Sequence, residues 1–212
     1  MSVHVESGTG RERLVRRGRS LAWFTIAWNG IEGVAGIVAG VAAGSIALLG
    51  FGIDSYVEVF AGSVIIWRLA KDRHGHELSE LAERRAIRLI AATFLLLAVG
   101  VGMESVRELA TGAEPERSLF GIGLAVVSLA VMPLLAHTKR RVGEQLGSRA
   151  VTADATESML CVLLSAILLA GLGLNALFGW WWADPLAGLG IVYVAAREGI
   201  EHWRTDELND CC

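Results

Sequence analysis

The sequence contains too few cysteines for a disulfide-stabilised fold. It has three in 212 residues, and two of them, Cys211 and Cys212, are the last two residues. Three cysteines do not make the paired framework of a small secreted protein, and Cys161 lies inside a long apolar segment. Cysteine usage therefore gives no indication of an oxidising compartment.

Two short signals are also missing. No Gly-x-x-x-x-Gly-Lys pattern occurs, which argues against a phosphate-binding loop and against direct use of nucleotide hydrolysis. The first twenty residues are polar and rich in arginine, without a short apolar core before a small-residue cleavage site. We therefore expect no cleavable signal peptide, and the first apolar segment would itself direct insertion into a membrane.

Long apolar segments dominate the chain instead. Hydrophobic residues make up 53% of the sequence, and the mean hydropathy is +0.50. Six segments approach the roughly 20 residues that cross a bilayer as a helix: 21–43, 45–67, 89–106, 119–136, 150–172 and 180–196. The pattern predicts an all-α membrane protein, a bundle of six transmembrane helices over residues 21–203. A basic cytoplasmic segment, 1–20, would precede it, and a short tail, 204–212, would follow.

The basic residues indicate the orientation of these helices. If the N-terminus is cytoplasmic, seventeen of the nineteen Lys and Arg residues fall on the inner side and only Arg107 and Arg117 on the outer side. Such a bias predicts that both termini are cytoplasmic in a multi-pass protein of a cell membrane, such as a bacterial inner membrane. The basic inner rim would face anionic lipid, and we expect no nucleic-acid partner.

Five acidic residues inside the apolar segments are the candidate functional residues. They are Glu32 in the first segment, Asp54 and Glu58 in the second, and Asp154 and Glu157 in the fifth. One charge at the bilayer centre costs roughly 2.5–3.5 kcal/mol, so five cost on the order of 10 kcal/mol. None of the six segments contains Lys, Arg or His. We therefore expect the counter-charge to come from outside the chain, as bound protons or a bound cation.

The spacing of these residues predicts a shared site. Asp54 and Glu58 are four residues apart, which places them on one helix face about 6 Å apart along the axis. Glu157 and Cys161 have the same spacing, and Asp154 lies one turn earlier on that stripe. If the antiparallel second and fifth helices pack together, Asp54 comes level with Cys161 and Glu58 with Glu157. Four potential ligands then meet in one cavity, the number that a tetrahedral zinc-type site requires.

Two of the buried groups have alternative explanations that stay open. Glu32 could belong to the cluster, or Asn29 and Glu32 could simply form hydrogen bonds with a neighbouring helix. Cys161 could be a metal ligand or a small apolar side chain. The terminal pair, Cys211 and Cys212, could pass metal to the membrane site or belong to a disordered tail.

At these residues the sequence resembles the cation diffusion facilitator family of zinc and related metal transporters. Members carry an apolar stretch that ends in an Asp-x-x-x-Asp or His-x-x-x-Asp pair in the second helix. Here the stretch reads SIALLGFGIDSYVE and gives Asp54 and Glu58. The last segment begins WWWADPLAGL, which is similar to a Trp-x-Asp-Pro start in the family and contains Asp184.

The fifth-helix motif departs from the family pattern. The family usually has Ala-Asp-x-x-His-x-x-x-Asp, whereas ADATESMLC places Asp154 at the first acid, Glu157 at the His and Cys161 at the last Asp. This departure leaves the identity of the metal open. Three carboxylates and one thiolate mix hard and soft ligands, so we expect Zn²⁺ or Cd²⁺ to bind better than Mg²⁺ or Ca²⁺.

The resemblance implies a secondary transporter, not an enzyme, that exchanges a zinc-like divalent cation for protons by alternating access. The metal would be the transported substrate, with no tightly bound cofactor. The chain resembles the compact branch of the family without the C-terminal cytoplasmic domain, and we expect a homodimer. The alternative is a membrane metal sensor or accessory protein that does not transport. An intramembrane metalloenzyme is less favoured, because such sites usually supply His ligands.

Overall fold

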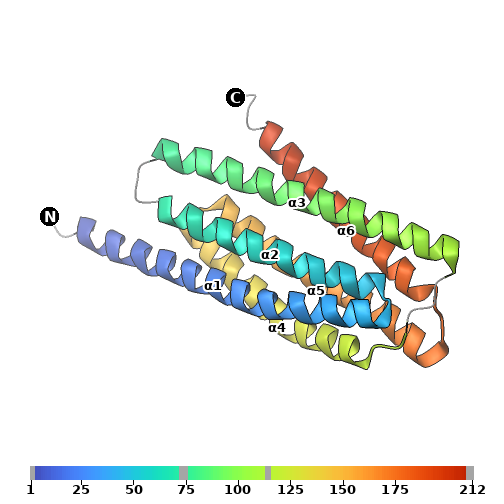
Figure 1. Cartoon of the computed structure of the whole chain (residues 1–212). Helices are drawn as coiled ribbons and strands as arrows, with labels where there is room; N and C mark the ends of the chain where they lie inside the picture. Colours follow the sequence, from blue (N-terminus) through green and yellow to red (C-terminus); the bar gives the residue numbers. More distant parts are fainter. Residues whose placement is uncertain (1–2, 72–75, 113–115, 209–212) are drawn as a thin grey trace.

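The computed structural model describes residues 3–71, 76–112 and 116–208, and these residues form six α-helices. The helices run up and down along one axis, so that α1 begins and α6 ends at the same end of the bundle (Figure 1). We call this the terminal end and the opposite one the far end. The bounds are α1 Val3–Ala43, α2 Ile46–Lys71, α3 His76–Thr111, α4 Leu119–Leu146, α5 Arg149–Phe178 and α6 Ala183–Leu208.

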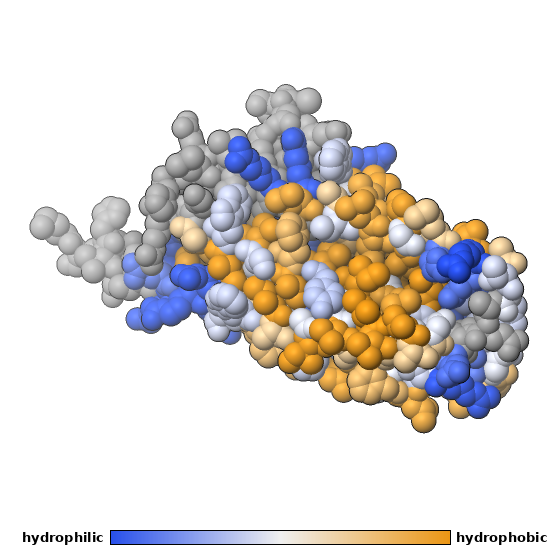
Figure 2. Space-filling view, viewed as in Figure 1, coloured by the Kyte–Doolittle hydropathy of each residue, from blue (hydrophilic) through white to orange (hydrophobic). Residues whose placement is uncertain are grey.

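The all-α membrane architecture predicted from the sequence is confirmed. Five helices, α1 to α5, are long and apolar enough to cross a membrane. Figure 2 shows the corresponding broad apolar band on the visible face, with hydrophilic side chains toward both ends. Helix α6 has a shorter apolar stretch, between Asp184 and Arg197. The sixth crossing and the cytoplasmic location of the termini stay predictions, and Cys211 and Cys212 lie outside the described residues.

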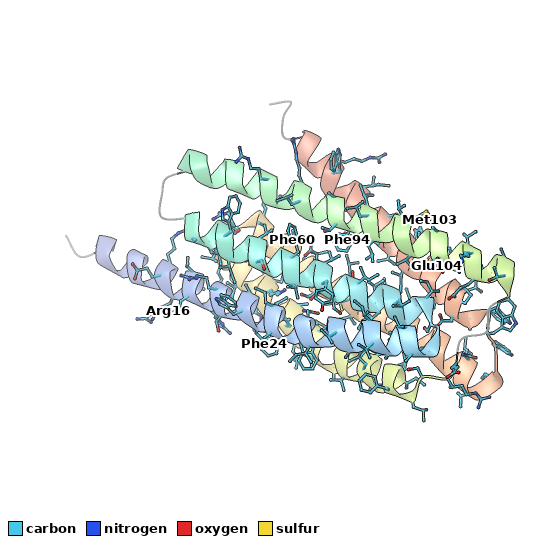
Figure 3. The ribbon with its side chains drawn as sticks, in the orientation of Figure 1. Arg16, Phe24, Phe60, Phe94, Met103 and Glu104 are labelled. Atoms are coloured by element: carbon cyan, nitrogen blue, oxygen red, sulfur yellow. The ribbon has the colours of Figure 1, made fainter. Side chains whose placement is uncertain are left out.

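The side chains labelled in Figure 3 show the same separation between polar ends and an apolar middle along the bundle axis. Arg16 of α1 lies toward the terminal end and Glu104 of α3 toward the far end, with Phe24, Phe60 and Phe94 between them (Figure 3). Charged groups toward both ends and apolar side chains between them are what a bilayer requires of a spanning bundle.

Two hairpins of the bundle turn on the same Gly-Ser pair. Gly44 ends α1 with φ 63°, and Gly147 ends α4 with φ 64°, a conformation that glycine adopts without strain. Ser45 and Ser148 then cap α2 and α5, because each Oγ accepts a hydrogen bond from the backbone N–H three residues later, at 3.1 and 3.4 Å. Helix α4 continues to Leu146, through the basic run 139–141 that follows the predicted apolar segment 119–136.

The two halves of the chain, α1–α3 and α4–α6, repeat one arrangement in opposite directions. Helix α1 packs on α2 as α4 packs on α5, and α2 packs on α3 as α5 packs on α6. Contacts between α1 and α4, α2 and α5, and α3 and α6 join each helix to its counterpart. The α1–α2 turn lies at the far end, whereas the α4–α5 turn lies at the terminal end (Figure 1). This is an inverted-topology repeat, with the α2–α5 contact between the halves.

An offset of 103 residues relates the two hairpins, because 147 − 44 = 103 for the turn glycines. The same offset joins Gly40 to Gly143, and both glycines lie against the following helix. A Cβ on Gly40 would lie 2.7 Å from the backbone N of Leu49, and one on Gly143 would lie 2.9 Å from that of Thr152. Close backbone approach therefore fixes the register of both hairpins in the same way.

The contact between α1 and α2 gives a test of this packing. A Cβ on Gly52 would lie 2.6 Å from the backbone N of Ile37 and 2.9 Å from the carbonyl carbon of Gly36. Since backbone atoms cannot move aside cheaply, we expect Gly52→Ala to lower the free energy of unfolding by about 1–3 kcal/mol. The matched control is Gly30→Ala, because nothing lies within 4 Å of a Cβ there, and alanine favours the helix. Equal thermal unfolding temperatures in detergent for the two variants would contradict the close contact.

Candidate metal centre

The five candidate ligands lie in helices α2 and α5, which contact each other. The predicted pairing of the second and fifth helices is therefore confirmed. All five side chains are buried, with exposed fractions of 3% or less: Asp54, Glu58, Asp154, Glu157 and Cys161.

These groups are near enough to act on one another electrostatically. Glu157 is affected by the charges of Asp154, Glu58 and Asp54, and Cys161 by those of Glu58 and Asp54. In the described part of the chain, no group of three or more His, Cys, Asp and Glu side chains is arranged so that it could hold a metal ion. Metal coordination by the five residues stays a prediction.

Helix α1 supplies two further polar groups to this cluster. Asn29, fully buried, donates from Nδ2 to Glu58 Oε2 at 2.7 Å. Glu32 accepts a long hydrogen bond of 3.5 Å from Ser55 of α2. Asn29 and Glu32 thus form the hydrogen bonds with a neighbouring helix that one alternative describes, and membership of Glu32 in a metal site stays a prediction.

Helix α4 supplies a base, which the sequence prediction missed. Lys139 Nζ lies 3.0 Å from Asp154 Oδ2 and donates a hydrogen bond of 2.9 Å to Ser158 Oγ. The side chains of Lys139 and Asp154 are only 1% and 3% exposed. The expectation that all counter-charge comes from outside the chain is therefore wrong for Asp154. The error arose because Lys139 lies beyond the apolar segment 119–136 but within the same continuous helix.

Several buried oxygen atoms of the cluster have no hydrogen-bond partner among the described residues. They include both carboxyl oxygens of Glu157 and one oxygen each of Asn29, Glu32, Glu58 and Asp154. A buried polar atom without a partner loses its hydration without compensation, at a cost of about 1–3 kcal/mol. The cluster therefore has unused acceptor capacity that protons or a cation could fill.

Asp184 lies outside this cluster, at the far end. It is fully buried, and its two carboxyl oxygens accept hydrogen bonds from Ser45 Oγ at 2.6 Å and from the backbone N–H of Ala47 at 3.2 Å. A carboxylate in this position satisfies free N–H groups at the start of α2 and complements the helix dipole. Asp184 therefore joins α6 to the N-terminus of α2.

The apolar helices make this a polytopic membrane protein. The buried carboxyl groups at the contact of two antiparallel helices give it a candidate cation site. The sequence profile described as the cation efflux transmembrane domain matches residues 22–205. The chain belongs to the cation diffusion facilitator family.

Curated relatives come from diverse organisms. A Synechocystis sp. protein described as an uncharacterized transporter is 30% identical over 154 residues, which are 70% of this chain and 49% of that protein. Transmembrane protein 163 of Xenopus laevis is 25% identical, with 85% of this chain and 64% of that protein covered. Magnetosome protein MamB of Magnetospira sp. (strain QH-2) is 29% identical, with coverage of 77% and 57%. The chain thus spans 49–64% of the length of these relatives.

The position of Asp184 predicts a role in stability that is separate from the cluster. Asp184→Ala leaves Ser45 and the Ala47 N–H without their acceptor, so we expect unfolding to become easier by about 1–3 kcal/mol. Asp184→Asn retains one acceptor oxygen and should lose less. Thermal unfolding in detergent would measure both. A variant that keeps full stability but loses metal binding would instead place Asp184 in the metal site.

Proposed function

We propose that the protein exchanges a zinc-like divalent cation for protons across the membrane, with the cluster between α2 and α5 as the transport site. The proposal rests chiefly on Glu157. Its carboxyl group is 1% exposed, faces the charges of Glu58 and Asp54, and has no hydrogen-bond partner on either oxygen among the described residues. Such a group needs a proton or a cation to be stable where it lies.

Competition between protons and metal would provide the coupling. The described charges that act on Asp54, Glu58 and Glu157 come from acids of the cluster and from one base, Lys139. Without metal, the surplus of carboxyl groups favours proton binding as a coupled group. A divalent cation supplies the missing positive charge and has to displace those protons, because it binds the ionised form.

The inverted repeat supports alternating exposure of this site. The offset of 103 residues relates Asp54 to Glu157 and Glu58 to Cys161, since 157 − 54 = 103 and 161 − 58 = 103. Each half thus contributes two candidate ligands at the same distance from its Gly-Ser turn. In transporters built from inverted repeats, the substrate site lies between the halves, and rocking of one half against the other exposes it to either side.

The chemistry of the candidate ligands favours zinc-like ions. The Cys161 thiol is fully buried and acts electrostatically with Glu58 and Asp54. Carboxylate oxygens together with sulfur suit Zn²⁺ and Cd²⁺ better than Mg²⁺ and Ca²⁺, which prefer oxygen ligands alone. The homodimer and the cytoplasmic termini expected from the sequence are further parts of the proposal.

Transport by the purified protein tests the proposal. In sealed proteoliposomes with an acidic interior, we expect accumulation of Zn²⁺ and Cd²⁺ but not of Mg²⁺, and a protonophore should stop it. Asp54→Asn should abolish accumulation and leave thermal stability intact, because Asp54 forms no ion pair among the described residues that the substitution would break. Glu144→Gln is the matched control, since Glu144 is exposed and pairs with Arg140 on the surface.

One outcome would contradict transport while it preserves metal binding. If the protein binds metal more tightly at higher pH, yet vesicles accumulate no metal under a gradient of either direction, the transporter proposal fails. The membrane sensor or accessory protein then becomes the better explanation.

A further inference from the structure

We propose that Lys139 is a fixed internal counter-cation of the metal centre, which holds Asp154 out of the set of metal ligands and opposes metal binding at the terminal end of the site. The inference rests on the proposed metal site. It adds a residue that tunes the affinity of that site without contact with the metal.

The ion pair between Lys139 and Asp154 is enclosed on all sides. Lys139 is 1% exposed and is among the largest fully buried side chains of the described residues. Its ammonium group contacts Asp154 Oδ2 at 3.0 Å and Ser158 Oγ at 2.9 Å. Ser158 in turn donates to the backbone carbonyl oxygen of Asp154 at 3.3 Å. One carboxyl oxygen of Asp154 is therefore already held by a charged donor, unlike the two oxygens of Glu157.

The charge of Lys139 acts on candidate ligands of both α2 and α5. It acts on Glu58 and on Glu157. The charges that act on Asp54 are those of Glu58 and Glu32, which are both acidic. Lys139 therefore lies beside Asp154 as a buried base next to several acidic candidate ligands.

The comparison of the two halves indicates that hairpin packing does not need this ion pair. The offset of 103 residues relates Lys139 to Gly36 and Asp154 to Phe51, since 139 − 36 = 103 and 154 − 51 = 103. The first hairpin thus has the same Gly-Ser turn and the same close glycine contact without any charged pair at these positions. The Lys139–Asp154 pair therefore belongs to the second half alone at these positions, next to the candidate ligands of α5.

The charge of Lys139 predicts the sign of its effect on metal affinity, and a purely structural role would predict a different sign. A positive charge near Glu58 and Glu157 repels a divalent cation and weakens its binding. Removal of that charge should therefore strengthen metal binding and free Asp154 as a further oxygen ligand. Loss of a residue that only supports the fold would weaken binding or leave it unchanged.

Calorimetric titration of the detergent-purified full chain with Zn²⁺ and with Cd²⁺ tests the proposal. We expect Lys139→Met to lower the Kd by about tenfold and Asp154→Asn, which leaves the lysine unpaired, to raise it by about tenfold. The double variant, Lys139→Met with Asp154→Asn, restores charge balance, and its Kd should lie within about threefold of wild type. Arg140→Met is the matched control, because Arg140 is exposed and pairs with Glu144 on the surface, and its Kd should not change.

The double variant decides the matter even if a single variant does not fold, because it leaves no buried charge without its partner. A double variant that folds but binds metal about tenfold more weakly than wild type would make Asp154 a direct ligand and overturn the inference. A folded Lys139→Met protein with weakened binding would overturn it as well. Wild-type protein that binds neither ion would refute the proposed metal site itself, which is a different result.

Discussion

Burial of five carboxyl groups beside one buried lysine is the constraint on which this structure depends. A charge inside a membrane protein is costly unless it is paired, protonated or bound to a cation. The chain meets part of the cost with the Lys139–Asp154 pair and with donors from three helices, including Asn29 of α1. Glu157 receives no such donor among the described residues. The uncompensated part of the cluster is what the proposed cation or protons would neutralise.

The same two backbone features position these groups in both halves of the chain. A glycine with positive φ ends the first helix of each hairpin, and a serine caps the second. Close glycine contacts then hold each hairpin in register. Because the ligand candidates of both halves stand at equal distances from their turns, the inverted packing of α2 on α5 places them on two helices that contact each other. Asp184 adds a link from α6 to the first turn of α2.

The sequence predicted the parts of this arrangement that depend on local pattern. Long apolar segments gave the helices, and four-residue spacings placed Asp54 with Glu58 and Glu157 with Cys161 on helix faces that proved to be buried. Lys139 was not predicted as a partner of the cluster because it lies in a basic run beyond the apolar segment 119–136. Gly147 and Ser148 mark the end of α4 further along the chain. The bond from Asn29 to Glu58 joins different helices, and spacing along one helix carries no information about such a partner.

Crystallographic anomalous scattering from the cadmium-loaded protein tests the central claim most directly. We expect one cadmium peak between α2 and α5, with Glu157 and at least one of Asp54 and Glu58 as ligands. We also expect the Lys139–Asp154 contact of 3.0 Å to be retained beside the ion. A peak on Asp154 with Lys139 displaced, or a peak only at the far end near Asp184, would contradict this claim.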